Sequence, residues 1–144
     1  MHSQQQAFFL ESKFGQFSVR KTGIPKPGPG ELLVKLEASA LNPLDWKIQA
    51  YGLFVEKYPA VLGFDAAGVV VEIGDGVAPG TFSVGDRVCV CCVLRPCACI
   101  LNHRCYRFVQ GWIDAESRGT RGVFLQYNTF PAKFTFKVCP PVIE

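Results

Sequence analysis

Residues 31–41, ELLVKLEASAL, alternate apolar and polar side chains over the length of one β-strand. Two further stretches, AAGVVVEIG at 66–74 and GVFLQYN at 122–128, are apolar at strand length. Glycines and prolines separate these stretches, as in the connection IPKPGPG at 24–30. The pattern therefore predicts a mostly β fold, a partly open barrel with short helices.

A short helix is predicted directly after the first of these strands. In NPLDWKIQAYG, residues 42–52, Asn42 can cap the helix and Pro43 occupies its first turn, where a missing N–H costs nothing. Gly52 follows the helix and can end it in a left-handed conformation. The helix would place residues 45–47 together on its first turn.

Composition and charge exclude several classes of protein. The chain has 144 residues, of which 49% are hydrophobic and 19% charged, which is typical of a folded domain. Its fifteen lysines and arginines are scattered and give a net charge of only +3, so we expect no nucleic-acid partner. The start, MHSQQQAFFLESKFG, has no basic leader before an apolar run, and no stretch has the roughly 18 apolar residues of a membrane span. We therefore expect a cytoplasmic protein without membrane contact.

Four segments together carry a resemblance to a known family. They are PKPGPGELLVKLEASALNPLDWKI at 25–48, YPAVLGFDAAGVVVEIG at 58–74, FSVGDRV at 82–88 and GVFLQYNTFPAKFTFKV at 122–138. In this order they resemble the N-terminal GroES-like domain of the zinc-independent medium-chain dehydrogenases/reductases. Within that superfamily, LNPLDWK and GFDAAG are similar to quinone oxidoreductases and to the trans-acting enoyl reductases of fungal polyketide synthases. The resemblance implies a GroES-like domain over residues 1–137, without the family's Rossmann domain.

The resemblance also predicts that no metal is bound. Zinc members of the superfamily carry a cysteine where Asn42 stands, and a histidine and a glutamate where Phe64 and Asp65 stand. Amide and phenyl side chains cannot replace thiolate and imidazole ligands. We expect the carboxylate of Asp65 to accept hydrogen bonds from backbone amides at a turn.

The resemblance implies NADPH as the cofactor of the full-length family, although we expect none to bind stably to this chain alone. Lys47 matches a lysine beside the cofactor and is the candidate catalytic residue; a solvent-facing lysine on a short helix is the alternative. The substrate implied is a small molecule or an acyl thioester. The candidate cofactor-binding residues are Asn42, Leu44, Asp45, Trp46 and Lys47, and the candidate substrate-binding residues are Thr120, Phe124 and Gln126.

Six of the seven cysteines lie between Gly85 and Trp112, a density that the rest of the chain lacks. Cys89, Cys92, Cys97 and Cys105 have the spacing C-x2-C-x4-C-x7-C, close to the C-x2-C-x2-C-x7-C structural zinc lobe of zinc members. The middle gap differs, and zinc-free relatives carry no such lobe.

An insertion explains this cysteine-rich stretch better. Removing residues 89–107 joins GDRV to FVQGW and restores the family's passage from one strand to the next. Codon degeneracy permits splice signals at both edges. The Val-Cys pair recurs at 138–139, and from there CPPVIE at 139–144 no longer matches the family, so we expect an aberrant tail over 138–144. Two unspliced introns would account for the insertion and for an aberrant tail.

Three interpretations of function follow. The first is a truncated part of an NADPH-dependent, zinc-free enoyl or quinone reductase, inactive alone. The second is a small β-domain that zinc stabilises through the cysteines of residues 89–105 and that serves as a binding module. The third is a self-assembling ring like the co-chaperonins of the same fold, although fold alone does not determine function.

Overall fold

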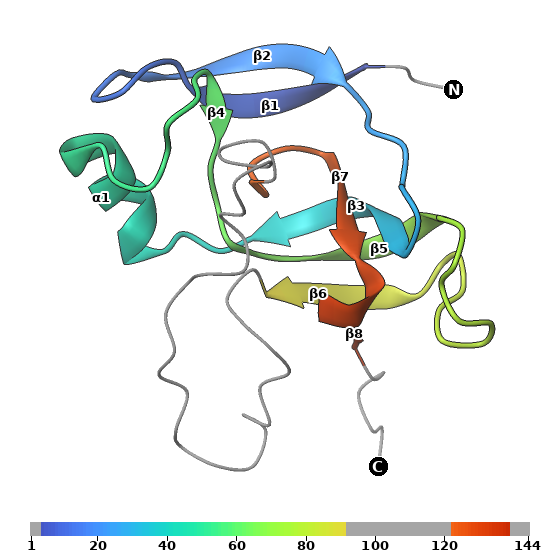
Figure 1. Cartoon of the computed structure of the whole chain (residues 1–144). Helices are drawn as coiled ribbons and strands as arrows, with labels where there is room; N and C mark the ends of the chain where they lie inside the picture. The colour runs from blue at the N-terminus through green and yellow to red at the C-terminus, as the bar shows by residue number, and fades with distance from the viewer. Residues whose placement is uncertain (1–3, 92–121, 139–144) are drawn as a thin grey trace, which may run out of the picture.

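The structure is a computed structural model that describes residues 4–91 and 122–138. Two antiparallel sheets make up most of it, and Figure 1 shows the smaller sheet lying above the larger one, with the helix at one side. The elements in chain order are β1 (Gln4–Leu10), β2 (Phe17–Gly23), β3 (Glu31–Ser39), α1 (Pro43–Tyr51), β4 (Ala60–Val61), β5 (Asp65–Ile73), β6 (Arg87–Cys91), β7 (Tyr127–Pro131), the 3-10 turn η1 (Ala132–Phe134) and β8 (Thr135–Lys137). The predicted mostly β, partly open barrel is confirmed.

The larger sheet has the strand order β7-β3-β5-β6-β8, so β3 and β5 lie at its centre. Some of their apolar residues form the core: Leu32, Val34 and Val70 are fully buried, in one cluster with Leu10 of β1. Val88 of β6 and Phe130 of β7 belong to the same core. Burial of such a side chain stabilises the fold by about 1.5–3 kcal/mol. The core therefore rests on the residues that the strand pattern identified.

Gly68 allows the two central strands to approach closely. It pairs with Leu36 next to a shift in the register between β3 and β5. A Cβ atom at Gly68 would lie 2.1 Å from the carbonyl oxygen of Lys35. Because that oxygen belongs to the backbone, no side-chain movement could remove the clash. The glycine in the apolar stretch 66–74 therefore serves packing between backbones.

The stretch 122–128 forms less of a strand than the sequence predicts. Regular pairing with β3 begins only at Tyr127. Before it, the Phe124 amide donates to the carbonyl of Leu62 over 3.1 Å, and the Phe8 amide donates to the carbonyl of Phe124 over 2.8 Å. The backbone of this segment thus bonds to two different elements in turn, which prevents a continuous ladder.

Part of the range predicted as an insertion belongs to the larger sheet. Cys89 pairs with Ala67 of β5 and with Phe136 of β8, and Val90 is buried. Residues 92–107 and the tail from residue 139 lie outside the described residues. The first tail residue, Val138, donates its amide to the carbonyl of Arg87 over 2.8 Å. Among the described residues no helix is both long and apolar enough to cross a membrane.

Candidate functional site

The candidate site is built at the start of α1, where the chain leaves β3. Asn42 is the N-cap residue, Pro43 begins the helix, and Gly52 ends it with a φ of 61°, as the sequence predicts. The Asp45 carboxylate reaches back to the cap, because the Asn42 amide donates to Asp45 Oδ2 over 2.7 Å. This bond, from the backbone of the N-cap residue to the side chain of the third helical residue, is one of the two bonds of a capping box, and it fixes the first turn of the helix.

Asn42 also joins the helix to β5. Its side-chain Nδ2 donates to Asp65 Oδ2 over 3.0 Å. The Ala40 amide donates to the carbonyl of Asp65 over 2.9 Å, which holds the end of β3 against the start of β5. The expectation that backbone amides hold the Asp65 carboxylate is thus not what the structure shows, since its partner is the Asn42 side chain.

Two carboxylates therefore bond to one residue, and both keep an oxygen without a partner. Oδ1 of Asp45 and Oδ1 of Asp65 are buried and form no hydrogen bond. Burial raises the pKa of Asp45; the amides of Asn42 and Gly63 lower it, and the nearby charge of Asp65 raises it further. The site thus holds negative charge in a poorly hydrated place.

Trp46 and Lys47 face outward from the same turn. The indole of Trp46 is half-exposed, and the Lys47 ammonium lies 5.7 Å from the centre of its ring, a cation–π arrangement. Tyr51 is next to it, with its ring centre 5.9 Å from that of Trp46. The exposed face of α1 therefore offers aromatic surface together with one positive charge.

Two further aromatic residues are exposed outside the helix. Phe14 and Phe54 are exposed and adopt left-handed backbone conformations, with φ of 62° and 64°. Phe14 lies at the end of α1, because a Cβ atom at Gly52 would meet its ring at 3.0 Å. The sequence analysis missed both residues, and their local sequence gives no signal for positive φ values.

The predicted site residues are only partly brought together. Leu44 is half-buried against the core, and Asp45 is buried with its carboxylate turned to the cap, whereas Trp46 and Lys47 are exposed. Phe124 lies beside Gly63, the glycine whose amide acts on Asp45. The sequence thus identified one turn of helix whose residues face in two directions.

The other two predicted substrate residues do not form a site with Phe124. The side chain of Gln126 turns to β1, where its Oε1 accepts from the Gln6 amide over 3.0 Å. Thr120 lies outside the described residues.

A pocket of about 530 Å³ opens next to Asp65. Cys89 contributes an exposed thiol to it, a residue that the sequence analysis assigned to the insertion and not to the site. Side chains alternate between the two faces of a strand, so Cys89 faces away from the buried Val88 and Val90 of β6. This alternation is the sequence signal that could have identified it. The pocket is lined by Ala38, Ser39, Ala40, Asp65, Ala66, Ala67, Cys89 and Val90.

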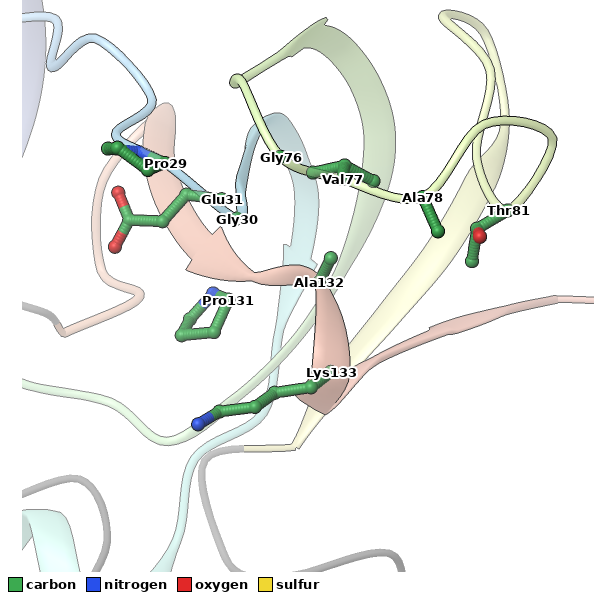
Figure 2. A pocket seen from close by; sticks show the side chains of 10 residues that line it. All are labelled: Pro29, Gly30, Glu31, Gly76, Val77, Ala78, Thr81, Pro131, Ala132 and Lys133. Atoms are coloured by element: carbon green, nitrogen blue, oxygen red, sulfur yellow. The ribbon is translucent and has the colours of Figure 1, made fainter.

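A second pocket, of about 560 Å³, involves none of the predicted site residues. Figure 2 shows that three separate segments form it: the approach to β3, the loop between β5 and β6, and the turn from β7 into η1. Its lining is mostly small and apolar, with Glu31 and Lys133 as the charged members. Among the described residues no group of three histidine, cysteine or acidic side chains could hold a metal ion.

Comparison with known proteins places these features in a family. Residues 28–140 match the family model of the alcohol dehydrogenase GroES-like domain. A trans-enoyl reductase of Aspergillus flavipes is 46% identical over 91 residues, which are 61% of this chain and 26% of that protein. A chloroplastic quinone-oxidoreductase homolog of Spinacia oleracea is 44% identical over 71 residues, 47% of this chain and 21% of that protein.

Solved structures with similar folds support the same family. An alcohol dehydrogenase superfamily protein of Novosphingobium aromaticivorans, 31% identical, superposes with a TM-score of 0.68 over 92% of this chain and 34% of its own. An alcohol dehydrogenase of Escherichia coli complexed with NADH, 27% identical, superposes with a TM-score of 0.69 over 99% of this chain and 40% of its own. The chain thus spans well under half the length of the proteins that it matches.

Proposed function

Because the chain belongs to the family of the alcohol dehydrogenase GroES-like domain, we propose that it is the N-terminal portion of a zinc-free, NADPH-dependent reductase of activated C=C bonds. Matches to proteins named trans-enoyl reductase and quinone oxidoreductase support an enoyl thioester or a quinone as the substrate. Because the matched part is a minor share of these proteins, we further propose that the chain alone is inactive.

The observation that carries the zinc-free assignment is the bond between Asn42 and Asp65. A catalytic zinc needs three protein ligands and an open position. The residues at this point of the fold do not fit it, because Phe64 offers no ligand atom and the side-chain amide of Asn42 donates a hydrogen bond to the Asp65 carboxylate. No step of the proposed reaction therefore passes through a metal.

NADPH would supply a hydride when bound, and the residues of α1 fit a supporting role. The Lys47 ammonium is exposed and has no carboxylate partner among the ion pairs of the described residues, so it can attract the phosphates or the ribose oxygens of a dinucleotide. Trp46 presents a half-exposed aromatic face next to it. Asp45 is buried and supports this exposed face indirectly, by holding the N-cap of the helix. Asn42, the N-cap residue, lies between the buried and the exposed residues of this turn.

The domain organisation is also a proposal: a GroES-like domain over 1–137, an insertion at 89–107 and an aberrant tail at 138–144. The structure of β6 supports it. Removal of 89–107 would bring Phe108, Val109 and Gln110 to the positions of Cys89, Val90 and Cys91. A valine would again occupy the buried position, so the alternation of β6 would be kept.

The proposed function is tested by completing the enzyme with a nucleotide-binding part. Residues 1–137 without 89–107 would be fused to the nucleotide-binding part of the Aspergillus flavipes relative, and oxidation of NADPH and of NADH measured with a 2-enoyl thioester and with a quinone. We expect turnover with one of these substrates, and none from the 144-residue chain. A folded fusion that binds NADPH but reduces neither substrate would contradict the proposal.

The zinc-dependent binding module stays an alternative that no described contact favours. Its cysteines, other than Cys89 and Cys91, lie outside the described residues. Stoichiometric zinc in the purified chain would support it, whereas a zinc-free chain with the same thermal unfolding before and after chelation would support the reductase fragment. The ring-forming alternative predicts a ring-sized species in solution, which sedimentation would reveal.

A further inference from the structure

The pocket of about 560 Å³ in Figure 2 contains none of the residues proposed to contact NADPH, and backbone hydrogen bonds fix its walls. The Gly30 amide donates to the carbonyl of Asp75 over 2.6 Å, and the Ala132 amide donates to the carbonyl of Gly30 over 2.9 Å. Gly30 therefore joins the loop after β5 to the turn after β7. Because these backbone groups are already paired, the recognition of a ligand is left to the side chains of the pocket.

The space inside the pocket is open and mostly apolar. Gly30 and Gly76 have φ of 74° and 77°, a left-handed conformation that glycine adopts without strain. A Cβ atom at Gly30 would meet nothing within 4 Å, so the space beside this residue is empty of protein atoms. Val77 and Ala132 pack against the core and also line the pocket. A cavity of this size with fixed, mostly apolar walls can hold a small molecule.

Two opposite charges stand at one side of this pocket. Figure 2 shows the side chains of Glu31 and Lys133 extending toward the same side, with the ring of Pro131 between them. Val77 and Ala78 lie at the other side. The pocket therefore combines an apolar part with a charged edge that carries both signs.

Each of the two charges is held by its own neighbour. Glu31 Oε2 accepts from the Gly28 amide over 3.0 Å, which orients the carboxylate. The Lys133 ammonium lies 4.9 Å from the centre of the Phe134 ring. Within the part of the chain that the structure describes, no ion pair joins Glu31 to Lys133. The two charges are therefore positioned separately and do not neutralise each other directly.

We propose that this pocket binds a small zwitterion with an apolar body, of the class of the apolar α-amino acids. The ammonium group of such a ligand would lie near the Glu31 carboxylate and its carboxylate near the Lys133 ammonium, with the apolar side chain against Val77. A simple anion would be attracted by Lys133 but repelled by Glu31, and a simple cation the reverse. The proposal concerns a second site and does not depend on the reductase activity.

The experiment uses the 144-residue chain at neutral pH, with L-leucine as the probe. Two-dimensional NMR follows the backbone amides as leucine is added to about 20 mM. We expect saturable shifts at Gly30, Val77 and Ala132, which line the pocket. Absence of shifts, or shifts confined to other residues, would overturn the proposal. No step involves NADPH, so the outcome is independent of the proposed function.

Three analogues test which parts of the ligand are recognised. 4-Methylpentanoate lacks the ammonium group, 3-methylbutylamine lacks the carboxylate, and glycine lacks the apolar side chain. Each should bind at least about fivefold more weakly than leucine, the loss that corresponds to one charge-assisted hydrogen bond or one apolar contact. Equal affinity of any of the three would overturn the proposed ligand class.

Variants then test the two charges and the cavity. In Lys133→Gln, leucine and 3-methylbutylamine should bind alike, because the ligand carboxylate has lost its partner, and in Glu31→Gln, leucine and 4-methylpentanoate should bind alike. Lys21→Gln, at an exposed lysine of β2, is the control and should keep the full preference for leucine. Ala78→Phe, at an exposed residue of the wall, should fill the pocket and abolish the shifts. Leucine binding that survives Ala78→Phe, or a preference that Lys133→Gln leaves intact, would overturn the site.

Discussion

The side-chain amide of Asn42 lies 3.0 Å from the carboxylate of Asp65, 23 residues further along the chain. This bond connects the first turn of α1 to the first residue of β5. It joins two segments that are far apart in the sequence, and the chain's stability should depend on it.

Asn42→Asp tests this connection. The substitution keeps the shape and the capping ability of the residue but replaces the donor to Asp65 with a third carboxylate. We expect the free energy of unfolding to fall by about 1–3 kcal/mol at pH 7, measured in urea. Gln16→Glu, an exposed amide changed in the same way, should cost far less; equal costs would show that the Asn42–Asp65 bond adds little.

Asp86 should make the stability of the chain depend on pH. Its carboxylate accepts from Lys137 over 2.7 Å and from the Ser83 amide over 2.7 Å, and these bonds lower its pKa. A lowered pKa contributes stability that is present above the unfolded pKa and is lost as the pH falls through the folded pKa. Asp86→Asn should therefore lower Tm at neutral pH and leave it nearly unchanged at low pH, where the carboxyl group is protonated, so that the acid side of the plot of Tm against pH becomes flatter.

Gly68→Ala should destabilise the larger sheet by at least about 2 kcal/mol. A Cβ atom there meets the carbonyl oxygen of Lys35 at 2.1 Å, so the two central strands would have to separate. Gly23→Ala is the matched control, because a Cβ atom there meets nothing within 4 Å and the φ of Gly23 is not in the left-handed region. Similar unfolding midpoints for the two variants would contradict the packing role of Gly68.

Deletion of residues 89–107 should leave the sheets intact and raise Tm. It places Val109 where Val90 is buried in β6. Deletion of residues 89–106 is the control: it shifts the register by one and places Phe108 in that buried position, which should cost about 1–3 kcal/mol through overpacking. If both deletions unfold at the same temperature, the assignment of 89–107 as an insertion loses its structural support.

Lys47→Ala in the completed enzyme should lower kcat/KM for NADPH about fivefold or more, which corresponds to about 1 kcal/mol for one charge-assisted hydrogen bond. Lys21→Ala removes an exposed lysine from the edge strand β2 and should have no effect. Unchanged kinetics in the Lys47 variant would make it a solvent-facing lysine only.

Much of the fold followed from local sequence, because capping, turn formation and the strand period each depend on a few neighbouring residues. Asn42, Pro43 and Gly52 marked both ends of α1 correctly, residues 31–41 contained β3, and residues 66–74 contained all of β5 except Asp65. These features are decided within about ten residues of chain, which is the range over which a periodic pattern carries information.

The site was decided by contacts between distant segments. The sequence placed residues 45–47 on one turn, but only the folded structure shows that Asp45 is buried and that Trp46 and Lys47 are exposed. It gave Asp65 a backbone partner, whereas the fold supplied Asn42, and it extended the last strand too early, because residues 122–126 bond to β1 and to Leu62. Burial and hydrogen-bond partners are properties of the closed barrel, in which residues far apart in sequence compete for the same donors, and no local pattern contains that competition.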